Sequence, residues 1–413
     1  MVVMPPPLAC RLLNPADPDW PDRVETIRTL LGAPHNSDVF PSHFLRVVLP
    51  RIGGHAVLFQ RGNHTAGVGL LFPRAIEAGQ GVYTLRGHPL QGGVSVAELA
   101  EAASQMLPES RVIPYDPAAT HTFRRTSSIV DGWDIGAPSP EEAAMIRGLQ
   151  AQIWGLGADN LYPTDIHSGD FGSVHSQVVR SGKQVVAFLF GFYKFGGRPL
   201  PPAWHEGVNS DWRLESQVLG VHPDLRGRGV ATILKTQQAE LARQAGIDIV
   251  NWTADPLLWP NAVLNFGRLG AVAFDFVPGM YAFRNAMNRV PASRLALTWL
   301  VNSQRVRDHL RAPAGVSDLA ASGAVVVNQG WSAVDLACDA TRIAVEIPND
   351  WVALQARSLD EAEAWRSATD AVLAHYVGSE PGKYLITGVA RDGARCYLVV
   401  ERVTEERLGS IAQ

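Results

Sequence analysis

Arginine and glycine alternate at residues 226–229, and these residue types at this spacing are suited to holding a phosphate. Residues 214–221 before them are rich in β-formers, and apolar residues recur at helical spacing from Val230 onwards. The pattern predicts a strand, a short turn and the N-terminus of a long helix. The first N–H groups of a helix have no intrahelical partner, and glycine leaves them open to an anion. We therefore expect a phosphate cradle made of backbone N–H groups and two cationic side chains.

Two other phosphate-binding motifs share part of this pattern. A P-loop ends in lysine followed by serine or threonine, and residues 226–232 contain no such pair. A dinucleotide-binding turn has glycines spaced like Gly227 and Gly229, but Thr232 stands where its third glycine belongs. The residues upstream also favour a hairpin of strands over the first βα unit of a dinucleotide fold. A nucleotide-binding oxidoreductase is thus a distant alternative.

The residues Arg226-x-x-Gly229-x-Ala231 after a strand resemble the coenzyme A pyrophosphate motif of the GNAT acyltransferases, Q/R-x-x-G-x-G/A. The likeness covers roughly residues 140–300 and includes a later short helix that ends at Gly270. It implies an α/β (α+β) fold, with a GNAT-like mixed sheet and flanking helices. It also implies an N-acyltransferase that uses acetyl-CoA or succinyl-CoA as its co-substrate.

The resemblance also assigns residues to the cofactor. The strand end at 219–221 would pair its backbone with the pantetheine arm and supply an N–H to the thioester carbonyl. Asn261 and Asn265 are four residues apart on the short helix, so we expect them to share a face that bonds the pantetheine or the substrate. The residues expected to bind the cofactor are Leu219, Gly220, Val221, Arg226, Gly227, Arg228, Gly229, Val230, Ala231, Thr232, Asn261 and Asn265.

Acyl transfer from a thioester to an amine needs a base that takes the amine's proton. Glu215 lies near the start of the strand before the arginines, and alternation places it on one face with Gln217 and Leu219. The position matches the catalytic glutamate of some GNAT enzymes. The alternative is a carboxylate at the rim, paired with Arg213 or another surface base. His222 also follows the strand, but a turn residue before proline is more often structural.

The sequence departs from the GNAT pattern at the general acid. Many members have a tyrosine four residues before the glycine that ends the second motif helix, where this chain has Phe266. Either Tyr281 replaces that tyrosine, or the thiolate leaves unaided. The second route is open because a thiol has a pKa of about 8.5, not far above neutrality.

The sequence says little about which amine accepts the acyl group. Residues 248–257, followed by Asn261-Ala262, resemble a GNAT branch associated with bacterial amino-acid N-acylation and succinyl transfer. That resemblance implies a small amine such as an amino acid, with Trp252 among the substrate-binding residues. Arg294 is the candidate fork for a succinyl carboxylate. Phe266 motivates the alternative function, a non-catalytic acyl-CoA sensor or scaffold.

Two similarly ordered halves are expected before residue 301. In the first half, two helices precede three strands, a helix capped by Ser95 and a further strand. A comparable order follows the helix that begins after Ser139. The expected domains are a degenerate GNAT-like domain at 1–125, a CoA-binding GNAT domain at 138–300 and a C-terminal αβ extension at 301–413.

Residues 226–231, rich in arginine and glycine, form what we call the elbow. The first half of the chain has no such segment. Residues 86–93, between its third strand and its helix, are glycine-rich but do not have the Arg-x-x-Gly-x-Ala spacing. Pro89 also removes a backbone donor there. We therefore expect one CoA site per chain, within residues 138–300.

The composition limits the cell compartments and the classes of binding partner that we expect. The chain has 413 residues, 46% of them hydrophobic and 18% charged, and a formal net charge of −4, which gives no electrostatic case for nucleic acid or an anionic membrane. Cys10, Cys338 and Cys396 have no metal-ligand spacing, so we expect no metal and a reducing cytoplasm. The start of the chain lacks the apolar run of a signal peptide. We expect a soluble cytoplasmic protein with a small-molecule amine substrate and a possible homodimer.

Overall fold

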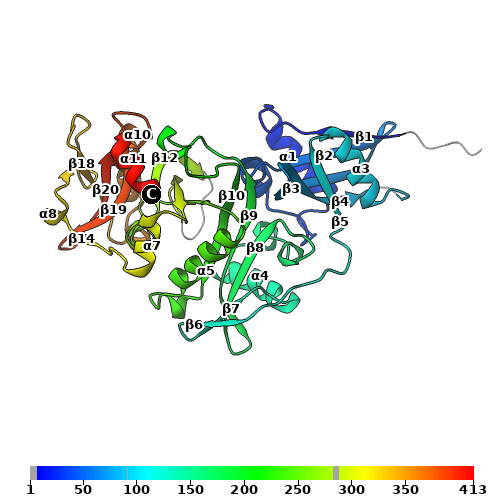
Figure 1. Ribbon diagram of the computed structural model, residues 1–413, viewed down its shortest axis with the longest axis horizontal. Helices are drawn as coiled ribbons and strands as arrows, with labels where there is room; N and C mark the ends of the chain where they lie inside the picture. Colours follow the sequence, from blue (N-terminus) through cyan, green and yellow to red (C-terminus); the bar gives the residue numbers. More distant parts are fainter. Residues whose placement is uncertain (1–6, 91, 282–287) are drawn as a thin grey trace, which may run out of the picture. The chain divides into compact units, whose positions relative to one another are not determined.

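The computed structural model describes residues 7–90, 92–281 and 288–413, so most of the proline-rich start of the chain lies outside the described residues. The chain forms two compact units. Unit 1 comprises Met1–Arg198 and Asp211–Leu234, and unit 2 comprises Pro199–Ser210 and Lys235–Gln413. Both units contain sheets with flanking helices (Figure 1), and both contain parallel as well as antiparallel strand pairs. The expected α/β class with mixed sheets is confirmed.

In the described part of unit 1, the first five strands form a sheet in the order β1-β2-β3-β4-β5. The predicted hairpin joins β2 to β3 through Gly62, whose φ of +61° suits glycine. Strand β4 runs parallel to β5, and helix α3 (Val96–Met106) connects them. Ser95 and Glu98 form a reciprocal capping box that confirms the predicted start of α3. The strands are β1 (Leu8–Leu12), β2 (His55–Arg61), β3 (His64–Glu77), β4 (Gln80–Pro89) and β5 (Ser110–Tyr115).

Helical segments lie in unit 1 where apolar spacing predicted them. Helix α1 (Trp20–Leu30) matches the first expected helix. The second is a π-helical segment, η1 (Phe44–Val48), followed by the single turn α2 (Leu49–Arg51). Helix α4 (Pro140–Trp154) begins after Ser139 with proline in its first turn and a capping box, as predicted.

The later strands of unit 1 pair antiparallel in the order β6-β7-β8-β9-β10. The first two form a short hairpin within residues 126–137, between the first two expected domains. Helix α4 packs against β9 and β10. The strands are β6 (Ser128–Val130), β7 (Trp133–Gly136), β8 (Val174–Ser181), β9 (Gln184–Phe195) and β10 (Trp212–Val221).

One hydrophobic core serves both halves of unit 1. The ring centroid of Phe44 is 4.8 Å from that of Phe192 on β9. The rings of Phe40 and Phe72 also lie against Phe192, at 6.4 and 5.9 Å. The predicted degenerate domain therefore buries its aromatic side chains against a strand of the predicted CoA domain.

In unit 2 the strand order is β15-β18-β20-β19-β12-β13-β11. Ile386 of β19 pairs with Ala273 of β12, so residues after 300 continue a sheet that begins in the predicted CoA domain. The two units do not coincide with the three predicted domains, whose independence stays a prediction. The strands are β11 (Ile249–Ala254), β12 (Val272–Tyr281), β13 (Ala292–Leu300), β15 (Val325–Val326), β18 (Arg342–Ile347), β19 (Tyr384–Asp392) and β20 (Arg395–Arg402).

Helices of unit 2 lie both before and after residue 300. Helix α10 (Leu359–Tyr376) begins after Ser358, which caps it, and packs against β12 and β18. Helix α5 (Val230–Gln244) begins in unit 1 and ends in unit 2. The remaining helical segments are α6 (Trp259–Ala262), the π-helical η6 (Val263–Arg268), α7 (Gln304–Arg311), α9 (Trp351–Arg357) and α11 (Glu405–Ala412).

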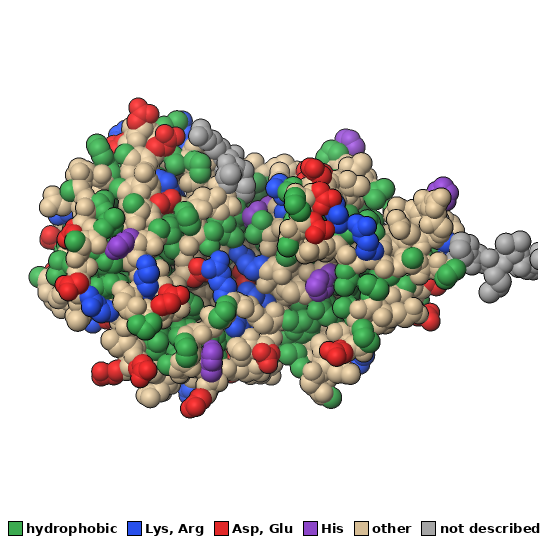
Figure 2. All heavy atoms as spheres, turned by 90° about the horizontal axis from the view of Figure 1, so that it is seen from above, with side chains coloured by type: hydrophobic (Ala, Val, Ile, Leu, Met, Phe, Trp, Pro, Cys, Tyr) green, Lys and Arg blue, Asp and Glu red, His purple; other side chains and the backbone are tan. Residues whose placement is uncertain are grey.

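Within residues 7–90, 92–281 and 288–413, no helix has the length and apolar character needed to cross a membrane. The same residues contain no group of three or more His, Cys, Asp or Glu side chains placed to hold a metal ion. On the face shown in Figure 2, acidic and basic side chains are interspersed among apolar ones.

Candidate active site

The elbow after β10 leads directly into the N-terminus of α5, as predicted. A 3-10 turn, η5 (Pro223–Leu225), separates the strand from the elbow, and the His222 ring accepts a hydrogen bond from the Asp224 N–H at 3.4 Å. The Ile233 N–H donates to the Gly229 carbonyl at 3.1 Å as an i→i−4 bond at the start of α5. The N–H groups of Val230 and Ala231 precede that bond, so no carbonyl of this helix can accept from them.

Backbone conformation explains the two elbow glycines. Gly227 has a φ of +77° and Gly229 a φ of +80°, values that L side chains rarely adopt. A Cβ at either position would meet no atom within 4 Å, so both glycines border open space. Arg226 and Arg228 are exposed, and neither forms an ion pair with another described residue. Open N–H groups, space and two exposed cations therefore coincide at this helix end.

A β-bulge interrupts β10 between its two ends. The pairing with β9 shifts between Ser216 and Val218, so Gln217 has no partner in the ladder. Its side chain donates to the Tyr162 hydroxyl at 2.9 Å. The predicted alternation is wrong beyond this point, because the extra residue places Glu215 on one face with Val218 and not with Leu219.

Glu215 is buried between two cations. Only 2% of the residue is exposed, so it is not a carboxylate at the rim. Its Oε1 lies 2.6 Å from Arg51 Nη2, and its Oε2 lies 3.1 Å from Lys194 Nζ. Burial lowers the pKa of Lys194, and the Glu215 charge opposes that shift. Arg51 and Lys194 thus fix the position of the Glu215 carboxylate and balance its charge.

Trp252 and Asn265 meet in unit 2. The indole N–H of Trp252 donates to Asn265 Oδ1 at 3.3 Å. Lys235 Nζ lies 3.7 Å from the centroid of the Trp252 ring, and only 3% of Lys235 is exposed. Asn265 is buried whereas Asn261 is exposed, and their sharing of a face that bonds a ligand stays a prediction. The helix becomes π-helical from Val263.

Tyr281 and Arg294 also lie together in unit 2. The Arg294 guanidinium stands 4.6 Å from the centroid of the Tyr281 ring, at the end of β12. Arg294 Nη1 is 3.5 Å from Asp255 Oδ2. Phe266, which stands at the expected acid position, is buried. The roles of Tyr281, Arg294 and Trp252 in a reaction stay predictions.

Sequence reasoning missed several charged residues of these clusters. Arg51 is 164 positions from Glu215, and nothing in the local sequence around it signals the pair. Lys235 gave a weak signal, since it follows Leu234 on the buried side of α5, where a lysine is unusual. Lys194 lies within β9 and Asp255 directly follows β11. The alternation of a strand predicts only whether such a residue is buried or exposed, and not which charged partner it meets.

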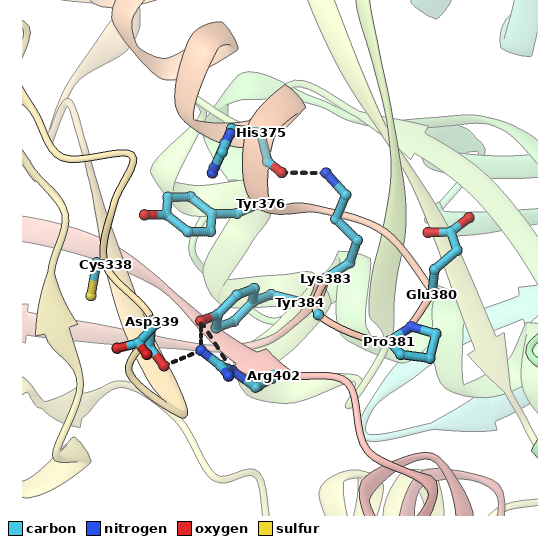
Figure 3. Close-up of a pocket in the computed structure, with 10 residues that line it drawn as sticks. Cys338, Asp339, His375, Tyr376, Glu380, Pro381, Lys383, Tyr384 and Arg402 are labelled. Atoms are coloured by element: carbon cyan, nitrogen blue, oxygen red, sulfur yellow. Dashed lines mark hydrogen bonds between the residues drawn. The ribbon is translucent and has the colours of Figure 1, made fainter.

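A separate cavity of about 430 Å³ lies in unit 2 (Figure 3). Lys383 Nζ donates to the His375 carbonyl at 2.5 Å, near the end of α10. Arg402 Nη2 donates to the Tyr384 hydroxyl at 3.0 Å. Both cations thus tie neighbouring segments together, and the cavity includes none of the predicted site residues. It is lined by Cys338, Asp339, His375, Tyr376, Glu380, Pro381, Gly382, Lys383, Tyr384 and Arg402.

No protein-family model matches this sequence, and no curated protein matches it. The solved structures that it resembles include acetyltransferases of the GNAT family. Arabidopsis thaliana NAA60 in complex with acetyl-CoA is 12% identical, with a TM-score of 0.34 over 41% of this chain and 98% of that one. The ribosomal-protein-S18-alanine N-acetyltransferase of Escherichia coli is 9% identical, with a TM-score of 0.30 over 40% of this chain and 92% of that one. A putative GNAT acetyltransferase from Desulfovibrio desulfuricans is 12% identical, with a TM-score of 0.28 over 43% and 97%. At such identities and TM-scores, the case for a function rests on the site itself.

Proposed function

We propose that this chain is a CoA-dependent N-acyltransferase that moves an acetyl or succinyl group to the amine of a small substrate such as an amino acid. The observation that carries the proposal is the path from β10 to α5. A bulged strand leads through two glycines of positive φ to an open helix N-terminus beside two exposed arginines. This combination suits a diphosphate that carries a long, extended arm.

The elbow would hold the pyrophosphate of the acyl-CoA. The N–H groups of Val230 and Ala231 would donate to its oxygens, and Arg226 and Arg228 would add charge. Gly229 lies beside open space, so phosphate oxygens can approach the backbone. The Thr232 hydroxyl is a further proposed contact at this end of the helix.

The bulge would serve the thioester end of the same molecule. At Gln217 the backbone leaves the β9–β10 ladder, which frees polar groups that regular pairing would occupy. Beyond it, residues 219–221 would run beside the pantetheine arm. An N–H group of this segment would stabilise the oxyanion that forms during acyl transfer.

The reaction follows from these parts. The lone pair of the amine attacks the thioester carbonyl carbon, a C–N bond forms, the C–S bond breaks and CoA leaves as its thiolate. The ammonium proton would pass to Glu215, directly or through water, and Arg51 and Lys194 hold that carboxylate in place. Tyr281 would protonate the thiolate, or the thiolate would leave unaided. Trp252 and Arg294 are the proposed contacts with the substrate.

Release of CoA thiol tests the proposal. Purified protein is mixed with acetyl-CoA or succinyl-CoA and a panel of amino acids, and free thiol is measured against controls without protein. We expect turnover with at least one combination. Absence of CoA binding by calorimetry would contradict both the cradle and the proposed activity.

Two observations favour a second candidate, an acyl-CoA sensor. Phe266 is buried and has no proton to give, and the Glu215 carboxylate is fixed between two cations. A protein that kept the cradle and lost the chemistry would bind CoA tightly. In the thiol assay it would show no turnover with any amine.

A further inference from the structure

Two arginines converge on one buried carboxylate in unit 2. Asp255 is 2% exposed and lies directly after β11. Its Oδ2 is 2.6 Å from Arg366 Nη2 and 3.5 Å from Arg294 Nη1. Two guanidiniums thus face this one buried carboxylate.

Arg366 has donors to spare. It lies on α10, within the residues that we expected to be a separate extension, and it is 6% exposed. Its Nε and Nη1 atoms are buried and have no hydrogen-bond partner among the described residues. A charged donor that is buried without a hydrogen bond costs free energy. A ligand that accepts from it would remove that cost.

The nearest further acid does not satisfy these donors. Asp370 Oδ1 is 3.9 Å from Arg366 Nη1, which is too long for a hydrogen bond, and it too has no partner. Asp370 Oδ2 accepts from the Ser293 hydroxyl at 2.5 Å. Burial raises the pKa of Asp370.

Both guanidiniums are held by aromatic rings. Arg294 lies 4.6 Å from the centroid of Tyr281, and Arg366 lies 5.1 Å from the centroid of Trp351. Such contacts fix the planes of the two guanidiniums before a ligand arrives. Fixed arginine planes are the usual means of recognising a carboxylate.

We infer that Arg366 and Arg294 form a subsite for a substrate carboxylate, with Asp255 holding the two guanidiniums in position. The inference rests on the proposed function, which offers two sources of that group. One is the terminal carboxylate of a succinyl chain, and the other is the α-carboxylate of an amino acid acceptor. Either would accept from the open donors of Arg366.

The experiment compares the parent protein with Arg366→Gln. Acetyl-CoA and succinyl-CoA are the donors, and the best amino acid of the panel and its amide are the acceptors. If the acceptor's carboxylate is bound, the parent favours the amino acid over its amide in kcat/KM by roughly 10- to 100-fold, and the variant loses that preference. If the carboxylate of the succinyl chain is bound, the variant instead loses the preference of the parent for succinyl-CoA over acetyl-CoA. Calorimetry then shows weaker binding of succinyl-CoA and unchanged binding of acetyl-CoA.

Arg305→Gln is the matched control. Arg305 is also a largely buried arginine of unit 2, but it donates to the carbonyls of Gly270 and Thr387, at 3.0 and 2.5 Å. Its loss removes the same charge and should leave both preferences intact. If Arg366→Gln does not fold, Arg294→Gln is measured with the same four combinations.

Two results would overturn the inference. In the first, neither arginine variant changes either preference, which would mean that the cluster is purely structural or holds an internal water. In the second, Arg305→Gln shifts the preferences as much as Arg366→Gln. Failure of the proposed function looks different, because the parent then turns over no combination. The calorimetric comparison of succinyl-CoA with acetyl-CoA and titration with the amino acid and its amide still decide the subsite in that case.

Discussion

At the scale of single residues, Glu215 has two expected roles. It is the proposed base, and it is also the anion that balances Arg51 and Lys194. We expect Glu215→Gln to lower kcat/KM for the amine by roughly 10²-fold. The variant should also unfold more easily, because two buried cations lose their counter-charge. Calorimetry should show nearly unchanged CoA affinity.

A second substitution separates the two roles of Glu215. Adding Lys194→Met to Glu215→Gln removes one cation and so restores part of the charge balance. Stability in urea should then recover partly, while the rate stays low. If activity returned with stability, Glu215 would be a structural anion and not a base.

Three histidines of unit 1 add to its acid sensitivity: His167 is buried, and His88 and His175 are partly buried. Burial lowers the pKa of His167 and His175 to about 4 and that of His88 to about 3. In the unfolded chain each titrates near 6.5, so below that pH the unfolded state binds more protons than the folded one. Stability should therefore fall as the pH drops from about 6.5 towards 4, by about 1.4 kcal/mol per pH unit for each histidine.

Urea unfolding at several pH values measures this slope. His175→Gln removes one titrating group, and its Nε2 has no described hydrogen-bond partner to lose. The variant should show a slope smaller by up to one proton between pH 6.5 and 4. An unchanged slope would mean that His175 does not stay neutral in the folded protein.

At the scale of elements, the elbow gives the sharpest test of the phosphate cradle. Gly229→Asp puts a carboxylate beside the N-terminus of α5, where it would repel a pyrophosphate and occupy the open N–H groups. Gly229→Asn has nearly the same shape and tolerates positive φ equally well. We expect the Asp variant to bind CoA at least 10-fold more weakly than the Asn variant by calorimetry. Equal affinities would remove the elbow from the CoA site.

The elements also show what sequence can and cannot predict here. Ser95 and Ser139 each precede a glutamate at the third helical position, so both helix starts followed from local chemistry. The bulge at Gln217 did not, because one inserted residue leaves no mark on an apolar pattern. Strands β6 and β7 were missed for a different reason, since three or four residues are too few to show a period.

The candidate site divides in the same way. The elbow was predictable because all of its parts are adjacent in sequence. The partners of Glu215 and Asp255 were not, since Arg51 and Arg366 are 164 and 111 positions away. Such pairs depend on how the sheets and helices pack, and that information is spread over the whole chain.

At the scale of the whole molecule, the two similarly ordered halves of the chain before residue 301 can be compared at one helix start. The start of α3 in the first half corresponds to the start of α5 in the second. Helix α5 begins with open glycines, whereas the start of α3 is closed by its capping box. There Glu98 Oε2 accepts from the Ser95 N–H at 2.7 Å, so a carboxylate already occupies the anion position. We therefore expect one CoA per chain in a calorimetric titration. Two equivalent sites per chain would show that the first half also binds the cofactor.

The shared aromatic core of unit 1 has a consequence for synthesis on the ribosome. Phe40, Phe44 and Phe72 emerge long before Phe192, the ring against which they pack. Translation proceeds at roughly 5–20 residues per second, so the nascent first half waits for seconds with an uncovered aromatic face. During that interval it is a natural client for a chaperone, and a pause or truncation before β9 would leave a chain prone to aggregation.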